Sequence, residues 1–103
     1  MAVHPAESTV GFAYESITVA GTAIGFTAGT FKPASQPPAT RAFLTLETAQ
    51  VRYRYDGTDP TATEGHILDT TQTLAIEGAQ SLLLFRAIRT GGTSGVLKVT
   101  YER

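Results

Sequence analysis

Several residue types are missing from this chain of 103 residues, and each absence excludes a class of site. Without cysteine there is no disulfide, no thiolate zinc site and no cysteine nucleophile. Tryptophan, the strongest stacking residue for sugars, is also missing. No apolar run approaches the roughly 18 residues of a membrane span, and the first ten residues, MAVHPAESTV, lack the basic start and apolar core of a signal peptide. We therefore expect a soluble protein made in a cytoplasm.

Positive and negative charges are nearly balanced in this chain. The formal net charge is −1 and the pI is about 6.0, so the basic stripe of a nucleic-acid-binding protein is missing and no attraction to anionic lipid is expected. A hydrophobic content of 42% with 17% charged residues is typical of a globular protein. The length predicts a single β domain over residues 9–103, preceded by a flexible N-terminal arm over residues 1–8.

Short runs of Thr, Val, Ile, Phe and Tyr, broken by Gly, Pro and Asp, are what the chain has instead of helical patterns. They predict an all-β fold, a small antiparallel β-sandwich or barrel, jelly-roll-like, with about seven or eight strands. The runs that carry this prediction are SITVA (16–20), TAIGFT (22–27), RAFLTLETA (41–49), VRYRYD (51–56), HILD (66–69), TLAIEG (73–78), LLLF (82–85) and VLKVTYE (96–102).

Two of these runs leave alternatives open. Residues 41–49 and 51–56 are separated only by Gln50, so they form either one long bent strand or a tight hairpin. Residues 82–85 are almost continuously apolar and fit a central buried strand, although a turn of helix at Gly78–Ser81 is the alternative. The Pro-rich stretch 28–40 is a connection that no strand can occupy.

The most specific stretch of the sequence is VRYRYDGTDPTATEGHIL, residues 51–68. Asp56, Asp59, Glu64 and His66 lie within eleven residues of one another and could hold a cation. Their spacing does not match an EF-hand loop. The simpler interpretation is favoured: Asp56-Gly57 and Asp59-Pro60 form turns, and the threonines between them bond the local backbone.

Catalytic patterns are weak. GGTSG, residues 91–95, lacks the G-x-S-x-G spacing of a nucleophile elbow. A triad of Ser94, His66 and an aspartate would depend on a single candidate base, because the second histidine, His4, lies in the arm. We predict no catalytic residue, no cofactor and no metal.

The tyrosines and arginines of strand 51–56 alternate, so they point to opposite faces. Tyr53 and Tyr55 are interpreted as core or inter-sheet packing, with a stacking platform for sugars or single-stranded nucleic acid as the alternative. Arg52 and Arg54 then face outward, where we expect each to pair with a carboxylate on a neighbouring strand or to contact another subunit.

A block of this sequence resembles a family of small tailed-bacteriophage proteins of about 100 residues. The block reads R-[YF]-R-x-D-G-T-x-P-T-x-x-x-G-H, here Arg52 to His66, followed by F-R-A-I at Phe85–Ile88. The likeness extends over roughly residues 38–101. It implies a non-enzymatic structural component of a virion, either a capsid decoration or cement protein or a head–tail accessory protein. A glycan-binding β module is the alternative function.

The resemblance also implies partners and a location. The expected partners are other virion proteins, either the major capsid protein or neck and tail proteins. We expect a homo-oligomer, with a trimer as one form, in a virion assembled in the host cytoplasm. Contacts would run through the arm, the loop 32–40 and outward-facing charged residues. The predicted interface residues are Lys32, Arg52, Arg54, Asp56, Asp59, His66, Arg86 and Arg89.

Overall fold

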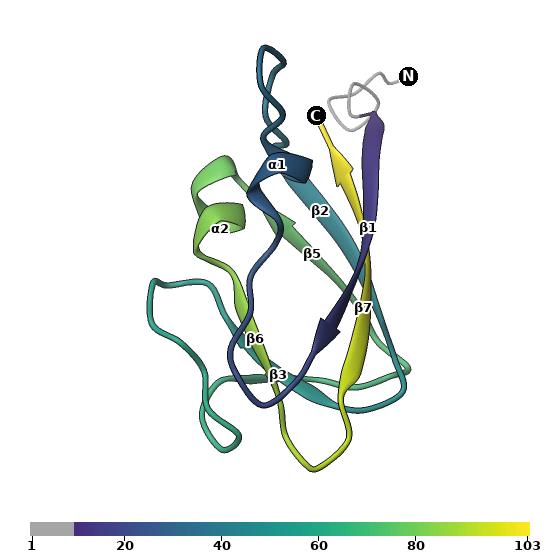
Figure 1. Cartoon of the computed structure of the whole chain (residues 1–103), viewed down its shortest axis with the longest axis vertical. Helices are drawn as coiled ribbons and strands as arrows, with labels where there is room; N and C mark the ends of the chain where they lie inside the picture. The colour runs from purple at the N-terminus through teal and green to yellow at the C-terminus, as the bar shows by residue number, and fades with distance from the viewer. Residues whose placement is uncertain (1–9) are drawn as a thin grey trace, which may run out of the picture.

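The chain folds into two antiparallel β-sheets, and a computed structural model describes residues 10–103 (Figure 1). The predicted arm over residues 1–8 lies outside the described residues. The strands are β1 (Gly11–Val19), β2 (Arg41–Glu47), β3 (Val51–Arg54), β4 (His66–Leu68), β5 (Thr73–Glu77), β6 (Arg86–Arg89) and β7 (Gly95–Glu102), and the helices are α1 (Ala28–Phe31) and α2 (Ala79–Leu84). One sheet has the order β1-β7-β2-β5 and the other β4-β3-β6. The prediction of a small all-β sandwich is confirmed.

The strand order is that of a jelly roll with one strand reduced to a single residue. Ile24 forms an isolated antiparallel bridge with Ala87 of β6, which places the segment between β1 and β2 beside β6. With this bridge included, the chain follows the eight-strand path of two interlocked Greek keys. The prediction of a strand at residues 22–27 is therefore wrong, because the segment forms only this single bridge. At Gly25 a Cβ atom would lie 2.7 Å from the Phe85 carbonyl oxygen, so only glycine fits where the chain passes β6 at this point.

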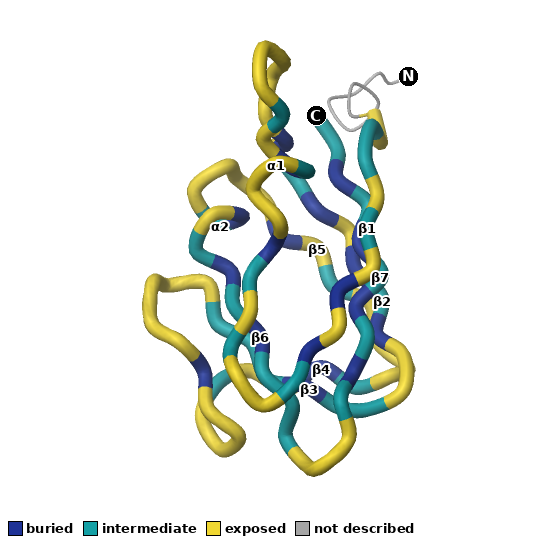
Figure 2. The backbone as a smooth tube through the Cα atoms, viewed as in Figure 1, coloured by how far each residue is buried: buried dark blue, intermediate teal, exposed yellow. Residues whose placement is uncertain are grey.

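The core lies between the two sheets (Figure 2). The alternation predicted for the last strand is confirmed, because Leu97, Val99 and Tyr101 of β7 are all buried. At one end of the sandwich the core is aromatic: the rings of Phe26 and Phe85 are stacked with centroids 4.3 Å apart, and Tyr101 packs edge-on against Phe26.

The apolar run at residues 82–85 is not a strand. Residues 79–84 form α2, so the helical alternative is the one adopted, and it extends further than the single turn considered. Gly78, with φ of +100°, turns the chain out of β5 and into this helix. Leu82 and Phe85 are buried while Leu83 is exposed. Leu82 is the buried residue of α2, and Phe85 follows the helix at its C-cap with an extended backbone.

The two runs around Gln50 form neither a hairpin nor one strand. β2 pairs with β5 and β7, whereas β3 pairs with β4 and β6. The chain bends between the sheets at residues 48–50, where Thr48 has a φ of +80°.

Candidate functional site

The loop between β3 and β4, residues 55–65, folds mainly through hydrogen bonds to its own backbone. The Thr58 amide donates to Asp56 Oδ1 at 3.3 Å. The Thr61 hydroxyl oxygen accepts from the amides of Thr63 and Glu64 at 3.3 and 3.0 Å. These are local turns of the Asx and Ser/Thr type. The turn at Asp56-Gly57 and the bonding of threonines to the local backbone are therefore confirmed, whereas Asp59 and Pro60 form no turn.

Arg52 fastens this loop to the outer face of β3. Its Nε donates to the Ala62 carbonyl at 3.1 Å and its Nη1 to the Gly65 carbonyl at 2.7 Å. The expectation that Arg52 pairs with a carboxylate on a neighbouring strand is wrong. The loop folds back over the arginine and offers two carbonyl oxygens, and the planar guanidinium can donate to both at once.

Arg54 also pairs close by, with Asp56 two residues further along the chain. Its Nε and Nη2 donate to the two carboxylate oxygens at 3.1 and 2.6 Å. The predicted partner on a neighbouring strand is again wrong. The Arg54 hydrogen bond, assisted by the Thr58 amide, lowers the pKa of Asp56 from 3.8 to about 2.

A close contact at Gly65 completes the loop. Gly65 has a φ of +130°, and a Cβ atom there would lie 3.1 Å from both the Pro60 side chain and the Tyr53 carbonyl oxygen. Pro60 is itself buried. Only glycine combines this backbone conformation with this contact distance.

An aromatic cluster continues from the loop toward the sandwich. Tyr53 stacks on Phe85 of the core and on Tyr55, with centroids 5.8 and 6.4 Å apart, and His66 packs against both tyrosines. Tyr53 is half-buried, and burial, with a smaller contribution from Tyr55, raises its pKa. The packing interpretation holds for Tyr53. Tyr55 lies at the surface instead, with 45% of its area exposed.

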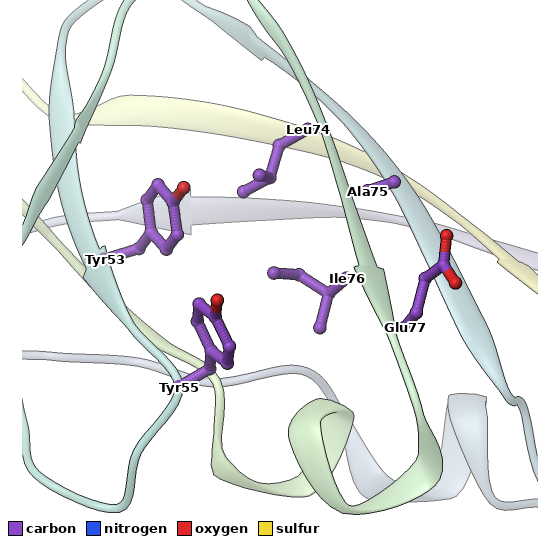
Figure 3. A pocket seen from close by; sticks show the side chains of 6 residues that line it. All are labelled: Tyr53, Tyr55, Leu74, Ala75, Ile76 and Glu77. Carbon is purple, nitrogen blue, oxygen red and sulfur yellow. The ribbon is translucent and has the colours of Figure 1, made fainter.

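The two tyrosines form one wall of a groove of about 300 Å³. The facing wall is β5, which contributes Leu74 and Ile76 (Figure 3). Both tyrosine rings point toward these two apolar side chains, and Glu77 lies at the end of the same strand. The sequence pattern gave no sign that β5 would face the tyrosines, because this contact depends on how the two sheets stack.

Most of the predicted interface residues gather around this loop. Arg86 on β6 reaches to 4.0 Å from Asp59 and also donates to the carbonyls of Leu83 and Phe85. Arg89, at the far end of β6, donates to Ser94 at 3.4 Å. Lys32 follows α1, on a segment remote from the loop in Figure 1. The structure thus brings six of the eight residues to one region: Arg52, Arg54, Asp56, Asp59, His66 and Arg86.

One partly buried polar contact was not predicted from the sequence. The Tyr101 hydroxyl donates to Glu15 of β1, which also accepts from the Thr27 amide at 3.1 Å and the Thr27 hydroxyl at 2.6 Å. Burial and the Glu15 hydrogen bond raise the pKa of Tyr101. Glu15 lies on the same face of β1 as Ile17 and Val19. Its place in the alternation of the sequence was therefore the signal that its side chain points inward.

Within residues 10–103, no three His, Asp or Glu side chains lie close enough together to hold a metal ion. In the same part of the chain, neither helix has the length and apolar character needed to cross a membrane. Comparisons with protein families, with curated proteins and with solved structures found no match to this chain.

Proposed function

We propose that this protein is a non-enzymatic structural component of a bacteriophage virion, either a capsid decoration or cement protein or a head–tail accessory protein. It acts by contacting neighbouring subunits. The observation that carries the proposal is the construction of loop 55–65. The sequence block that resembles the phage family coincides with this loop, and its defining residues hold the loop in one conformation.

A loop held in this way is suited to contacting a partner. Arg52 and Gly65 fix its base, while the tip presents Thr58 and Asp59, which are both exposed. Binding through such a loop loses little conformational entropy because the loop is already ordered. Jelly rolls also occur in viral capsid proteins, which supports the proposal at the level of the fold only.

The first experiment asks whether the chain is part of the particle. Virions of the phage that encodes it are purified through a density gradient, and the chain is quantified by mass spectrometry against the major capsid and tail proteins. We expect a constant ratio across preparations. If the chain stays with the soluble lysate proteins, the virion role is rejected.

A second experiment tests the loop as the contact surface. Asp59→Arg reverses an exposed charge whose nearest cation, Arg86, is 4.0 Å away. Glu47→Arg is the matched control. Glu47 is likewise exposed and 4.0 Å from a cation, Lys98, but both residues lie on the four-stranded sheet, away from the loop. We expect only Asp59→Arg to lower occupancy on particles that lack the wild-type chain. Equal occupancy of the two variants would mean that the loop does not contact the partner.

The groove between Tyr55 and β5 supports a second candidate, a glycan-binding module. An exposed tyrosine beside apolar side chains offers a stacking surface for a sugar ring, and lectins also use jelly rolls. A glycan array would test this, with Tyr55→Ala expected to abolish any signal and Tyr14→Ala to preserve it. Tyr14 is the control because it is 60% exposed but lies on the other sheet.

A further inference from the structure

The strands at the sheet edges are not equally protected against pairing with another chain. An edge strand exposes backbone amides and carbonyls, and proteins guard such edges with bulges, charges or covering segments. The edge strand β1 has a register shift between Gly11 and Ala13. Its inward-pointing Glu15 is bonded to Thr27, in the segment that runs past it. This edge is protected.

The second sheet is also guarded at both edges. Ile24 exchanges two backbone hydrogen bonds with Ala87 of β6, both 2.9 Å long, and the Arg89 amide donates to Ala20 at 3.0 Å. The same covering segment therefore occupies the β6 edge. At the other edge β4 is only three residues long, too short to template a ladder.

Among the sheet edges formed by residues 10–103, β5 is the exception. The Gly78 amide donates to the Thr40 carbonyl at 2.7 Å, and backbone groups alternate in direction along an antiparallel strand. Leu74 and Ile76 therefore bond to β2, and the amides and carbonyls of Thr73, Ala75 and Glu77 point away from it. The sequence TLAIE contains no proline, glycine, lysine or arginine, and its one charged residue, Glu77, lies at the end of the strand, 3.6 Å from Arg41 of β2.

We propose that β5 pairs with β5 of a second copy of this chain, antiparallel about a two-fold axis through Ala75. The register is self-complementary. Ala75 meets Ala75, where the small side chains leave room, and Thr73 lies opposite Glu77, so no like charges face each other. Each four-stranded sheet then continues into its partner as one eight-stranded sheet.

The inner face of the same strand favours a second copy over an unrelated occupant. Leu74 of one copy lies opposite Ile76 of the other in this register, and both face the groove walled by Tyr53 and Tyr55. Two copies thus bring their grooves together and remove exposed surface of Tyr55 from water. An isologous contact of this kind gives dimers. It does not depend on the virion role.

The chain contains no cysteine, so a single engineered cysteine reports the contact directly. Residues in a hydrogen-bonded antiparallel pair have Cα atoms about 5.5 Å apart and Cβ atoms about equally far apart, which is too far for an unstrained disulfide but within reach of a short bis-maleimide cross-linker. Ala75→Cys should therefore form a covalent dimer with this cross-linker, and Thr18→Cys, exposed on the outer face of β1, should not. Equal cross-linking of the two variants would overturn the proposal.

Light scattering over a hundredfold concentration range gives an independent test. The wild type should have about twice the chain mass of 10.9 kDa. Ala75→Lys places two cations on the two-fold axis and should raise the dissociation constant by roughly tenfold or more. Thr18→Lys should leave it unchanged, with all circular dichroism spectra alike. A monomeric or trimeric wild type, or a dimer insensitive to Ala75→Lys, would refute the β5 contact.

Discussion

Replacing Arg52 by alanine should unfasten loop 55–65 and lower the free energy of unfolding. The substitution removes both bonds that hold the loop against β3, at 3.1 and 2.7 Å. Hydrogen bonds from charged donors contribute about 1.5–3 kcal/mol each when well buried. The bond to Ala62 is exposed and the one to Gly65 only partly buried, so we expect a loss of about 2 kcal/mol in total.

Thermal unfolding followed by circular dichroism measures this loss. For a domain of this size, 2 kcal/mol corresponds to a fall in Tm of roughly 8–16 °C. Arg52→Lys is the matched control, because lysine keeps the charge and the aliphatic stem but lacks the planar fork that reaches two carbonyls. We expect it to recover about half of the loss.

Hydrogen exchange then separates local from global effects. The amides of Thr63 and Glu64 are bonded inside the loop and should exchange faster in Arg52→Ala even if the sandwich itself resists unfolding. If Tm and the protection of these two amides both match the wild type, the role assigned to Arg52 is incorrect.

Two further predictions concern ionisable groups. The pKa of Asp56 is lowered to about 2, so the stability gained from its bonds is present above pH 3.8 and is lost as the pH falls through about 2. In Arg54→Ala, carboxyl NMR titration should find the pKa of Asp56 raised toward 3.8. An unchanged value would exclude Arg54 as the main cause of the lowered pKa. The pKa of Tyr101 is raised, so its contribution is present below its usual value of 10.0 and is lost as the pH rises above it. Tyr101→Phe should cost about 1.5–3 kcal/mol in chemical unfolding at pH 7, because it leaves the Glu15 carboxylate without one donor, whereas a change near zero would show that the buried hydroxyl adds nothing.

The sequence predicted those strands whose side chains alternate between core and solvent. β7 is the clearest example, because Leu97, Val99 and Tyr101 alternate with polar residues and all three are buried. The apolar run 82–85 has no such alternation, so a short buried strand and a helix with one buried face fit it equally well. The structure decides through Gly78, whose positive φ ends β5 and begins α2.

The turns of the candidate site could be predicted for the same reason, since Asp56-Gly57 and the threonines act on backbone groups only a few residues away. The hydrogen-bond partners of Arg52 and Arg54 could not be predicted from the sequence. Arg52 reaches carbonyls 10 and 13 residues further along the chain, and their position depends on how the whole loop closes. The groove between Tyr55 and Ile76 was equally hidden, because it exists only once the two sheets are stacked.

The construction of the loop also limits what its sequence block can reveal about a partner. Arg52, Arg54 and Gly65 each satisfy a contact inside the loop, so the block would be required for this loop whatever the loop touches. A residue that recognises a partner must instead have groups left over after folding. Asp59 at the tip meets this condition, because its side chain is 71% exposed and its ion pair with Arg86 is long at 4.0 Å. Any specificity of the loop for a neighbouring subunit is therefore expected at its tip and not at the arginines of β3.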